Sequence, residues 1–162
     1  MKPKKIFVLG TVGSGKSTFS KKLSNQLKIK HIDLDDIFWE RKFNRKRSEK
    51  EREKLLLKTC NNKKWILEGV YTDWIESGIK KSDLVILLKI PLTKLIYGIT
   101  KRTLRREKSK KLGKEKYKEN FKDYLGLIKA AKNYYKKKHT RGYFKHRELV
   151  DKHKINFIIL KS

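Results

Sequence analysis

The chain has 162 residues, of which 37% are hydrophobic and 38% charged, and its formal net charge is +28. No stretch approaches the roughly 18 to 20 apolar residues of a membrane span. The single cysteine, Cys60, excludes a disulfide framework and favours a reducing, cytoplasmic location. The apolar residues are concentrated in short runs, which favours a folded domain over a disordered basic chain.

The first part of the chain predicts a strand, a helix and a second strand. Residues 6–9 form an apolar run that ends at a glycine, which is typical of a buried parallel strand. Apolar residues four positions apart then predict a helix over 16–28. A second short strand is predicted over 29–33.

The middle of the chain continues this alternation. A polar helix is predicted over 48–60, and Ser48 with Glu51 matches a capping box at its start. Apolar runs at 65–67 and 84–88 predict two further strands.

The last part of the chain predicts three helices, a loop and a strand. Pro91 suits the first turn of a helix that we expect to end near residue 106. Residues 107–118 have almost no apolar side chains and predict a mobile loop. Helices over 119–138 and 141–152 and a strand over 155–160 follow. The whole pattern predicts an α/β fold, a parallel sheet of about five strands with helices on both faces, in one domain over 1–162.

A phosphate-binding loop follows the first predicted strand. Residues 10–17 fit the pattern G-x-x-x-x-G-K-[ST], in which glycines let several backbone N–H groups converge on a phosphate chain. Lys16 is expected to reach the β- and γ-phosphates, and the Ser17 hydroxyl to bind Mg²⁺. The expected ATP-binding residues are Gly10, Gly13, Ser14, Gly15, Lys16, Ser17 and Thr18.

A phosphate-binding loop alone does not separate kinases from GTPases and ATPases. The guanine-reading pattern N-K-x-D is absent, because Asn62-Lys63-Lys64-Trp65 lacks the aspartate. The chain is short for a motor or a recombination ATPase. A compact kinase remains, which needs an acceptor site near the γ-phosphate and a cationic lid.

Acidic residues follow two of the predicted strands, where ligands of such sheets bind. Asp33 is expected to face the acceptor or Mg²⁺-bound water, although Asp33 or Asp35 could instead cap a short helix. Which of these two acids is the working one stays open. Asp36 is a further candidate for the acceptor site, and Glu68 is the candidate carboxylate behind Mg²⁺.

The candidate lid is a basic segment around residues 101–120. Its densest part, 101–118, has ten basic and two acidic residues. Arg102 and Arg106, in a cluster with Lys101 and Arg105, are expected to balance charge on the transferred phosphoryl group. The alternative is a favourable interaction of these cations with the end of the helix.

Aromatic residues flank the candidate acids. Trp39 and Tyr71, with Phe38, could stack on a base or sugar or belong to the core. The four histidines share no metal-ligand spacing with other candidate ligands, so Mg²⁺ is expected to arrive with ATP. The sequence Tyr134-Tyr135-Lys136-Lys137-Lys138 suggests a nucleic-acid surface or a helix with one buried tyrosine.

Three segments together resemble the adenylate-kinase-related P-loop proteins called DNA topology modulation (FlaR-like) proteins. These are residues 10–18, the segment His31-Ile32-Asp33-Leu34-Asp35-Asp36-Ile37-Phe38-Trp39, and Trp65-Ile66-Leu67-Glu68-Gly69-Val70-Tyr71. The resemblance implies the three-layer P-loop nucleoside triphosphate hydrolase fold of nucleotide-kinase type, ATP binding and a lid. Glu68 stands where the family has aspartate, and Val70 where it has asparagine.

The sequence therefore predicts an ATP- and Mg²⁺-dependent phosphotransferase acting on a nucleotide, a nucleoside or a hydroxylated metabolite. Two alternatives stay open. One is an ATP-gated nucleic-acid-binding protein that uses the basic surface, whose binding would weaken steeply with salt. The other is a slow nucleotidase, which would release phosphate without an acceptor.

Overall fold

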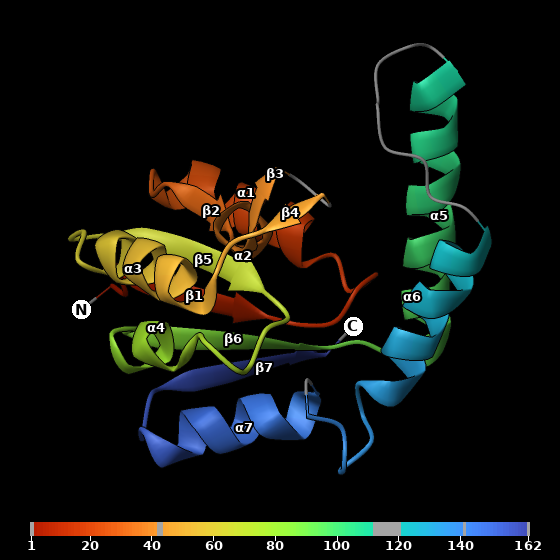
Figure 1. Ribbon diagram of the computed structural model, residues 1–162. Coiled ribbons are helices and arrows are strands. Elements are labelled where there is room, and N and C mark those ends of the chain that lie inside the picture. The colour runs from red at the N-terminus through yellow and green to blue at the C-terminus, as the bar shows by residue number, and fades with distance from the viewer. Residues whose placement is uncertain (1, 42–43, 112–120, 141, 162) are drawn as a thin grey trace.

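The computed structural model describes residues 2–41, 44–111, 121–140 and 142–161 (Figure 1). The strands are β1 (Lys5–Leu9), β2 (His31–Asp33), β3 (Trp39–Arg41), β4 (Arg45–Lys46), β5 (Trp65–Gly69), β6 (Leu84–Lys89) and β7 (Phe157–Lys161). The helices are α1 (Lys16–Leu27), α2 (Leu34–Phe38), α3 (Glu49–Cys60), α4 (Glu76–Lys80), α5 (Leu92–Lys111), α6 (Phe121–Asn133) and α7 (Tyr143–Lys152).

Five of the strands form one parallel sheet in the order β2-β5-β1-β6-β7. The central strand β1 pairs with β5 on one side and β6 on the other, and its residues 6–9 are buried. This confirms the predicted parallel sheet. Because the strands run the same way, the loops after β1, β2 and β5 all leave the sheet at the carboxyl ends of the strands, where most of the predicted site residues lie.

Helices cover both faces of the sheet, as the sequence predicts. On one face, α1 packs Phe19 and Leu23 against Ile6 and Val8 of β1. On the other face, side chains from α2, α3, α4 and α7 pack with Phe7 in the largest core cluster. The result is a three-layer arrangement, with α3, α4 and α7 in front of the sheet in Figure 1.

Helices α5 and α6 stand together beyond the ends toward which the strand arrows point (Figure 1). Leu95 and Ile99 of α5 pack with Ala131 of α6 and with Val12 of the phosphate loop. The pair is therefore anchored directly on the loop that is expected to bind ATP.

Two predicted helix ends differ from the structure by five residues each. Helix α5 continues to Lys111, so residues 107–111 are helical rather than a loop, because lysine and glutamate favour a helix by their intrinsic propensity. Residues 112–120, the rest of the predicted loop and lid, lie outside the described residues. Helix α6 ends at Asn133 rather than 138. Just beyond it, the Tyr134 carbonyl oxygen accepts a hydrogen bond of 2.8 Å from the backbone N–H of Tyr143.

Other features agree with or add to the prediction. The Ser48 and Glu51 capping box is present at the start of α3. Tyr134 is buried, as the interpretation of residues 134–138 as a helix with one buried tyrosine required, but this segment lies beyond the end of α6. The strand pair β3–β4 and helix α4 were not predicted, since all three elements are only two to five residues long.

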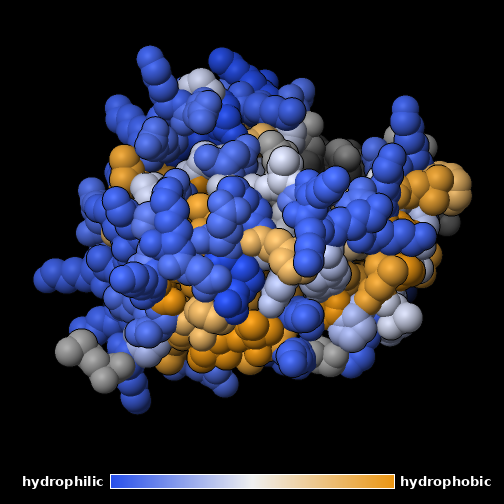
Figure 2. Space-filling view, turned by 90° about the horizontal axis from the view of Figure 1, so that it is seen from below, coloured by the Kyte–Doolittle hydropathy of each residue, from blue (hydrophilic) through white to orange (hydrophobic). Residues whose placement is uncertain are grey.

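The surface seen from below is mostly hydrophilic, with a hydrophobic area interrupting it (Figure 2). The lowest elements in Figure 1, α7 and β7, carry the exposed apolar residues Phe144 and Ile158. Among the helices of the described ranges, none combines the length and apolar character that a membrane crossing requires.

Candidate functional site

The phosphate-binding loop occupies the turn between β1 and α1. Gly13 and Gly15 both have φ of 78°, a left-handed conformation that glycine adopts without strain. The Thr11 carbonyl oxygen accepts the Ser14 hydroxyl at 2.7 Å, which closes the turn. Helix α1 begins at Lys16, so its positive N-terminal end faces the loop. The backbone therefore has the conformation that the sequence pattern predicts for binding a phosphate chain.

The loop lies against α5 at two glycines. A Cβ atom on Gly13 would lie 2.4 Å from the backbone oxygen of Leu95, and one on Gly98 would lie 2.5 Å from the backbone oxygen of Gly13. Only glycine allows this approach at both positions. Gly13 belongs to the phosphate-binding motif, whereas Gly98 lies outside any motif and gains its role only from the packing of α5 against the loop.

Glu68, at the end of β5, lies directly beside the loop. It is 1% exposed, and its Oε1 accepts a hydrogen bond of 2.6 Å from the Ser17 hydroxyl. The Lys16 Nζ lies 4.0 Å from its Oε2, and the His31 Nε2 lies 3.7 Å from its Oε1. Burial by itself would raise the pKa of Glu68, but His31, Lys16 and Ser17 outweigh it and lower the pKa below its usual value. Glu68 is therefore a buried carboxylate that is ionised at neutral pH.

These groups match the requirements of Mg²⁺. Among the residues that the structure describes, the buried Glu68 Oε2 has no hydrogen-bond partner, and the Ser17 hydroxyl is next to the same carboxylate. Mg²⁺ prefers oxygen ligands and keeps several waters. Within the described ranges, no group of three or more His, Cys, Asp or Glu side chains could hold a metal by itself. A magnesium ion shared with a phosphate chain suits this donor set.

The candidate acceptor acids begin helix α2. The Asp33 side chain accepts a hydrogen bond of 2.9 Å from the backbone N–H of Asp35, so Asp33 is the N-cap of α2. Asp35 Oδ1 accepts a hydrogen bond of 2.8 Å from the Tyr71 hydroxyl. Both acids line the same cavity as the phosphate-binding loop. The capping interpretation thus holds for Asp33, and it does not remove Asp33 from the cavity.

Two other predicted acceptor residues lie elsewhere. Asp36 is exposed and lines a different cavity, on the outer side of α2. Trp39 packs against Phe38, with ring centroids 5.0 Å apart, and does not line the cavity of the phosphate loop. Tyr71 is 8% exposed, and its ring stacks on Phe38 with centroids 4.8 Å apart. Its ring therefore belongs to the core, and only its hydroxyl, which is bonded to Asp35, reaches toward the site.

A buried hydrogen-bond chain links the Tyr71 backbone to His146 and Tyr134. His146 of α7 is fully buried, and its Nε2 lies 3.0 Å from the Tyr71 carbonyl oxygen. Its Nδ1 lies 2.9 Å from the Tyr134 hydroxyl. Since the carbonyl can only accept, Nε2 carries the proton and Nδ1 accepts from Tyr134. Burial lowers the pKa of His146 to about 4, which keeps the ring neutral. The sequence analysis missed this residue.

The cavity at the site has a volume of about 1140 Å³ and lies between the phosphate loop, the ends of β2 and β5, and helices α5 and α6. Its cationic lining residues are Lys16, Lys101, Arg102, Arg105, Arg106 and Lys122, and its acidic ones are Asp33, Asp35, Glu68 and Asp123. The predicted Arg102 and Arg106 are thus brought to the loop. Lys122 and Asp123 of α6 belong to no motif and were missed.

Comparison with known proteins places the chain among P-loop proteins. A family model described as "AAA domain" (AAA_18) matches residues 6–123. The Bacillus subtilis protein YqaC is 43% identical over 89 residues, which are 54% of this chain and 50% of that protein. Shikimate kinase from Francisella tularensis subsp. novicida is 51% identical over 37 residues, which are 23% of this chain and 21% of that enzyme. The matched segments thus span half or less of these relatives.

Solved structures agree on the fold. Shikimate kinase from Acinetobacter baumannii, in complex with shikimate, superposes with a TM-score of 0.58 at 16% identity, over 98% of this chain and 83% of that one. A gluconokinase from Sinorhizobium meliloti 1021 gives 0.54 at 11% identity, over 98% and 82%. The fold is the α/β nucleotide-kinase fold. The resemblance to DNA topology modulation proteins stays a prediction. Because the family model covers residues 6–123, well over half of the sequence, the chain belongs to the AAA domain family AAA_18 of P-loop proteins.

Proposed function

We propose that the protein transfers the γ-phosphoryl group of Mg²⁺-ATP to a small acceptor. The observation that carries this proposal is one cavity that holds both halves of a kinase site. The phosphate loop with Lys16 lies on one side of it, and the acids Asp33 and Asp35 lie on the other. Its volume of about 1140 Å³ exceeds the roughly 300 to 1,000 Å³ of an ordinary ligand pocket, which leaves room for a nucleotide and an acceptor together.

The cationic residues divide into two groups by position. Lys16 lies at the start of α1, where the helix end and the loop N–H groups also attract phosphate. Arg102 and Arg106 come from α5, which also lines the cavity. Phosphoryl transfer needs charge balance around the transferred group rather than a covalent partner. We assign Lys16 to the β- and γ-phosphates, and the two arginines to the transferred group.

Ser17 and Glu68 would hold Mg²⁺, Glu68 directly or through a water molecule. When bound, Mg²⁺ neutralises phosphate oxygens and fixes their geometry. The contribution of the chain is the orientation of the ligands. The hydrogen bond of 2.6 Å to Glu68 fixes the Ser17 hydroxyl, and the lowered pKa of Glu68 keeps the carboxylate charged.

Asp33 and Asp35 would bind the acceptor hydroxyl, with one of them accepting its proton. The cap of α2 orients Asp33, and Tyr71 orients Asp35. Asp36 and Trp39 do not line this cavity and have no role in the proposal. The acceptor is a nucleotide, a nucleoside or a hydroxylated metabolite. The names of the related proteins, shikimate kinase and gluconokinase, support a hydroxylated metabolite.

The test is ADP formation from Mg²⁺-ATP with separate pools of nucleosides, nucleoside monophosphates and hydroxylated acids. Lys16→Ala should lower acceptor-dependent turnover at least about a hundredfold, since an electrostatic contact to the transition state is removed. Its melting temperature should change little, because the Lys16 Nζ makes long contacts, 3.5 Å to the Thr11 carbonyl oxygen and 4.0 Å to Glu68 Oε2. Wild-type turnover in this variant would contradict the proposed site.

The same assay separates the alternatives. ADP formation that needs no acceptor would indicate a slow nucleotidase. ATP binding without any turnover would direct attention to ATP-dependent nucleic-acid binding, for which the comparisons give no support.

A further inference from the structure

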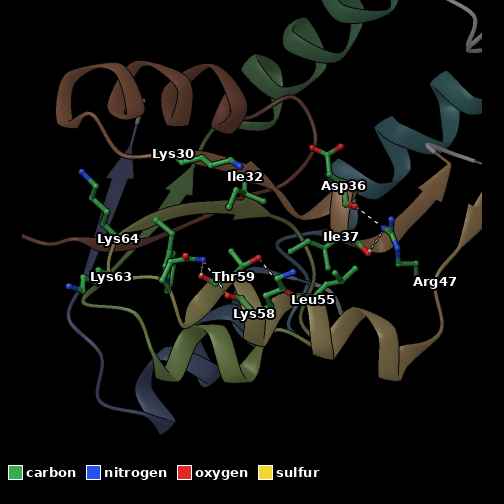
Figure 3. A pocket seen from close by; sticks show the side chains of 12 residues that line it. Lys30, Ile32, Asp36, Ile37, Arg47, Leu55, Lys58, Thr59, Lys63 and Lys64 are labelled. Carbon is green, nitrogen blue, oxygen red and sulfur yellow. Dashed lines mark hydrogen bonds between the residues drawn. The ribbon is translucent and has the colours of Figure 1, made fainter.

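A second cavity lies on the outer side of α2, against the edge of the sheet (Figure 3). It has a volume of about 740 Å³ and is bounded by α2, α3, the edge strand β2 and the start of β5. None of its lining residues also lines the cavity of the phosphate loop. It is therefore a separate site.

The rim of this second cavity is strongly basic. Four exposed lysines line it, from the loop before β2, from α3 and from the loop before β5: Lys30, Lys58, Lys63 and Lys64. Among the described residues that line the cavity, Asp36 is the only acid. Within the described parts of the chain, no ion pair or hydrogen bond engages the ammonium group of any of the four lysines. Their charges are thus uncompensated and attract an anion.

Arg47 also lines this cavity but is already engaged. Its guanidinium donates to the carbonyl oxygens of Asp36 and Ile37 at 2.8 and 3.0 Å (Figure 3). It also donates to the carbonyl oxygen of Trp39. These bonds satisfy carbonyl groups at the C-terminal end of α2. Arg47 therefore forms part of the cavity wall, and the four lysines are the cations left to bind an anion.

The interior of the cavity is apolar. Ile32 of β2, Ile37 of α2 and Leu55 of α3 line it together with Trp65. Apolar area that a ligand covers contributes favourable free energy in addition to its charges. The volume also lies in the range of pockets for small molecules rather than macromolecular surfaces.

We propose that this cavity binds a small organic anion that carries at least two negative charges on an apolar body. Phosphate esters and polycarboxylates share this chemistry. The charges would contact the lysines, and the body would cover Ile32, Ile37 and Leu55.

The cavity also adjoins the acceptor side of the proposed kinase site. Asp33 and Asp35, at the start of α2, line the cavity of the phosphate loop, while Asp36 and Ile37 line the second cavity. A helix of five residues carries both sets, so a ligand that shifts α2 acts on both. This coupling rests on the proposed function, whereas binding of the anion does not. Ligand in either cavity changes the affinity of the other by the same factor.

The probe is 8-hydroxypyrene-1,3,6-trisulfonate, a fluorescent trianion with an apolar body, titrated by anisotropy at 0.15 M salt. A saturating Mg²⁺-bound, non-hydrolysable ATP analogue keeps the phosphate loop occupied. The double variant Lys58→Gln/Lys63→Gln should weaken binding at least tenfold. The control Lys50→Gln/Lys54→Gln removes the same charge from α3, the helix that carries Lys58, but outside the cavity, and should retain the wild-type Kd within twofold. Equal weakening in both double variants would overturn the proposal.

Competitors identify the chemistry of the ligand. Displacement of the probe by benzene-1,3,5-tricarboxylate or by 1-naphthyl phosphate supports the site and separates carboxylate from phosphate ligands. If neither compound displaces the probe, the proposed anion site is overturned. Tighter binding of a 12-residue oligothymidylate than of any small anion, with the same dependence on Lys58 and Lys63, would also overturn it in favour of nucleic acid.

The coupling has its own readout. Saturating trisulfonate should change the Kd for Mg²⁺-ATP at least fivefold in the wild-type protein, and not in Lys58→Gln/Lys63→Gln. An unchanged Kd in the wild type would overturn the coupling. Because these are binding measurements, a protein without kinase activity would still give a decisive result.

Discussion

Replacing His146 by glutamine should reduce stability at neutral pH and remove a stability loss that the wild-type protein shows on acidification. His146 is fully buried, and it donates from Nε2 to the Tyr71 carbonyl and accepts at Nδ1 from Tyr134. A glutamine reproduces these two bonds with poorer geometry. A buried group that loses its partner costs about 1 to 3 kcal/mol, which is the expected loss at pH 7.5.

The pH dependence follows from the pKa of His146. Burial lowers it to about 4 in the folded protein, against 6.5 for a free histidine. Between these values the unfolded chain binds more protons than the folded one, so stability falls as the pH falls from about 6.5 toward 4. From pH 7.5 to 5.0 this residue alone should cost the wild-type protein about 2 kcal/mol.

The assay is urea unfolding at both pH values, followed by tryptophan fluorescence, for the wild type and His146→Gln. Groups other than His146 titrate in both proteins, so they cancel in the difference between the two. The stability advantage of the wild type should be about 2 kcal/mol smaller at pH 5.0 than at pH 7.5. If the wild type is more stable than His146→Gln by the same amount at both pH values, the conclusion that His146 is buried and neutral is refuted.

Two further predictions concern backbone features. Gly98→Ala should lower the free energy of unfolding by about 1 to 3 kcal/mol and weaken ATP binding, because its Cβ would lie 2.5 Å from the Gly13 oxygen. Gly126→Ala in the same cavity, whose Cβ meets nothing within 4 Å, is the control, and equal effects would contradict the close approach. Ser48→Ala should lower the free energy of unfolding by about 0.5 to 2 kcal/mol through loss of the cap of α3, with ATP affinity unchanged. An unchanged urea midpoint would show that the cap contributes nothing.

The fold could be predicted from local patterns because the strands are short apolar runs and the helices between them are amphipathic or capped. The five strands and the capping box at Ser48 follow directly from residue order. The end of α5 could not be predicted, since residues 107–111 have no apolar pattern and continue the helix by propensity alone.

The site was only partly predictable. Its loop is a contiguous motif, and Glu68 follows a recognisable strand. The choice among Asp33, Asp35 and Asp36 depends on where α2 begins, because neighbouring helix positions point about 100° apart. Asp35 therefore faces the phosphate loop and Asp36 the second cavity.

Gly98 and His146 could not be found from the sequence at all. Each gains its role from a partner at least 75 positions away in the chain, namely Gly13 and Tyr71. Neither lies in a motif, so only the packing of α5 and α7 reveals them.

The most direct test of the central claim is to follow the labelled γ-phosphoryl group of ATP in the presence of Mg²⁺ and the most active acceptor pool. The proposed function predicts that the label appears on an acceptor, with Lys16→Ala giving none above background. Label found only in inorganic phosphate, at the same rate with and without acceptor, would contradict phosphoryl transfer as the function of this site.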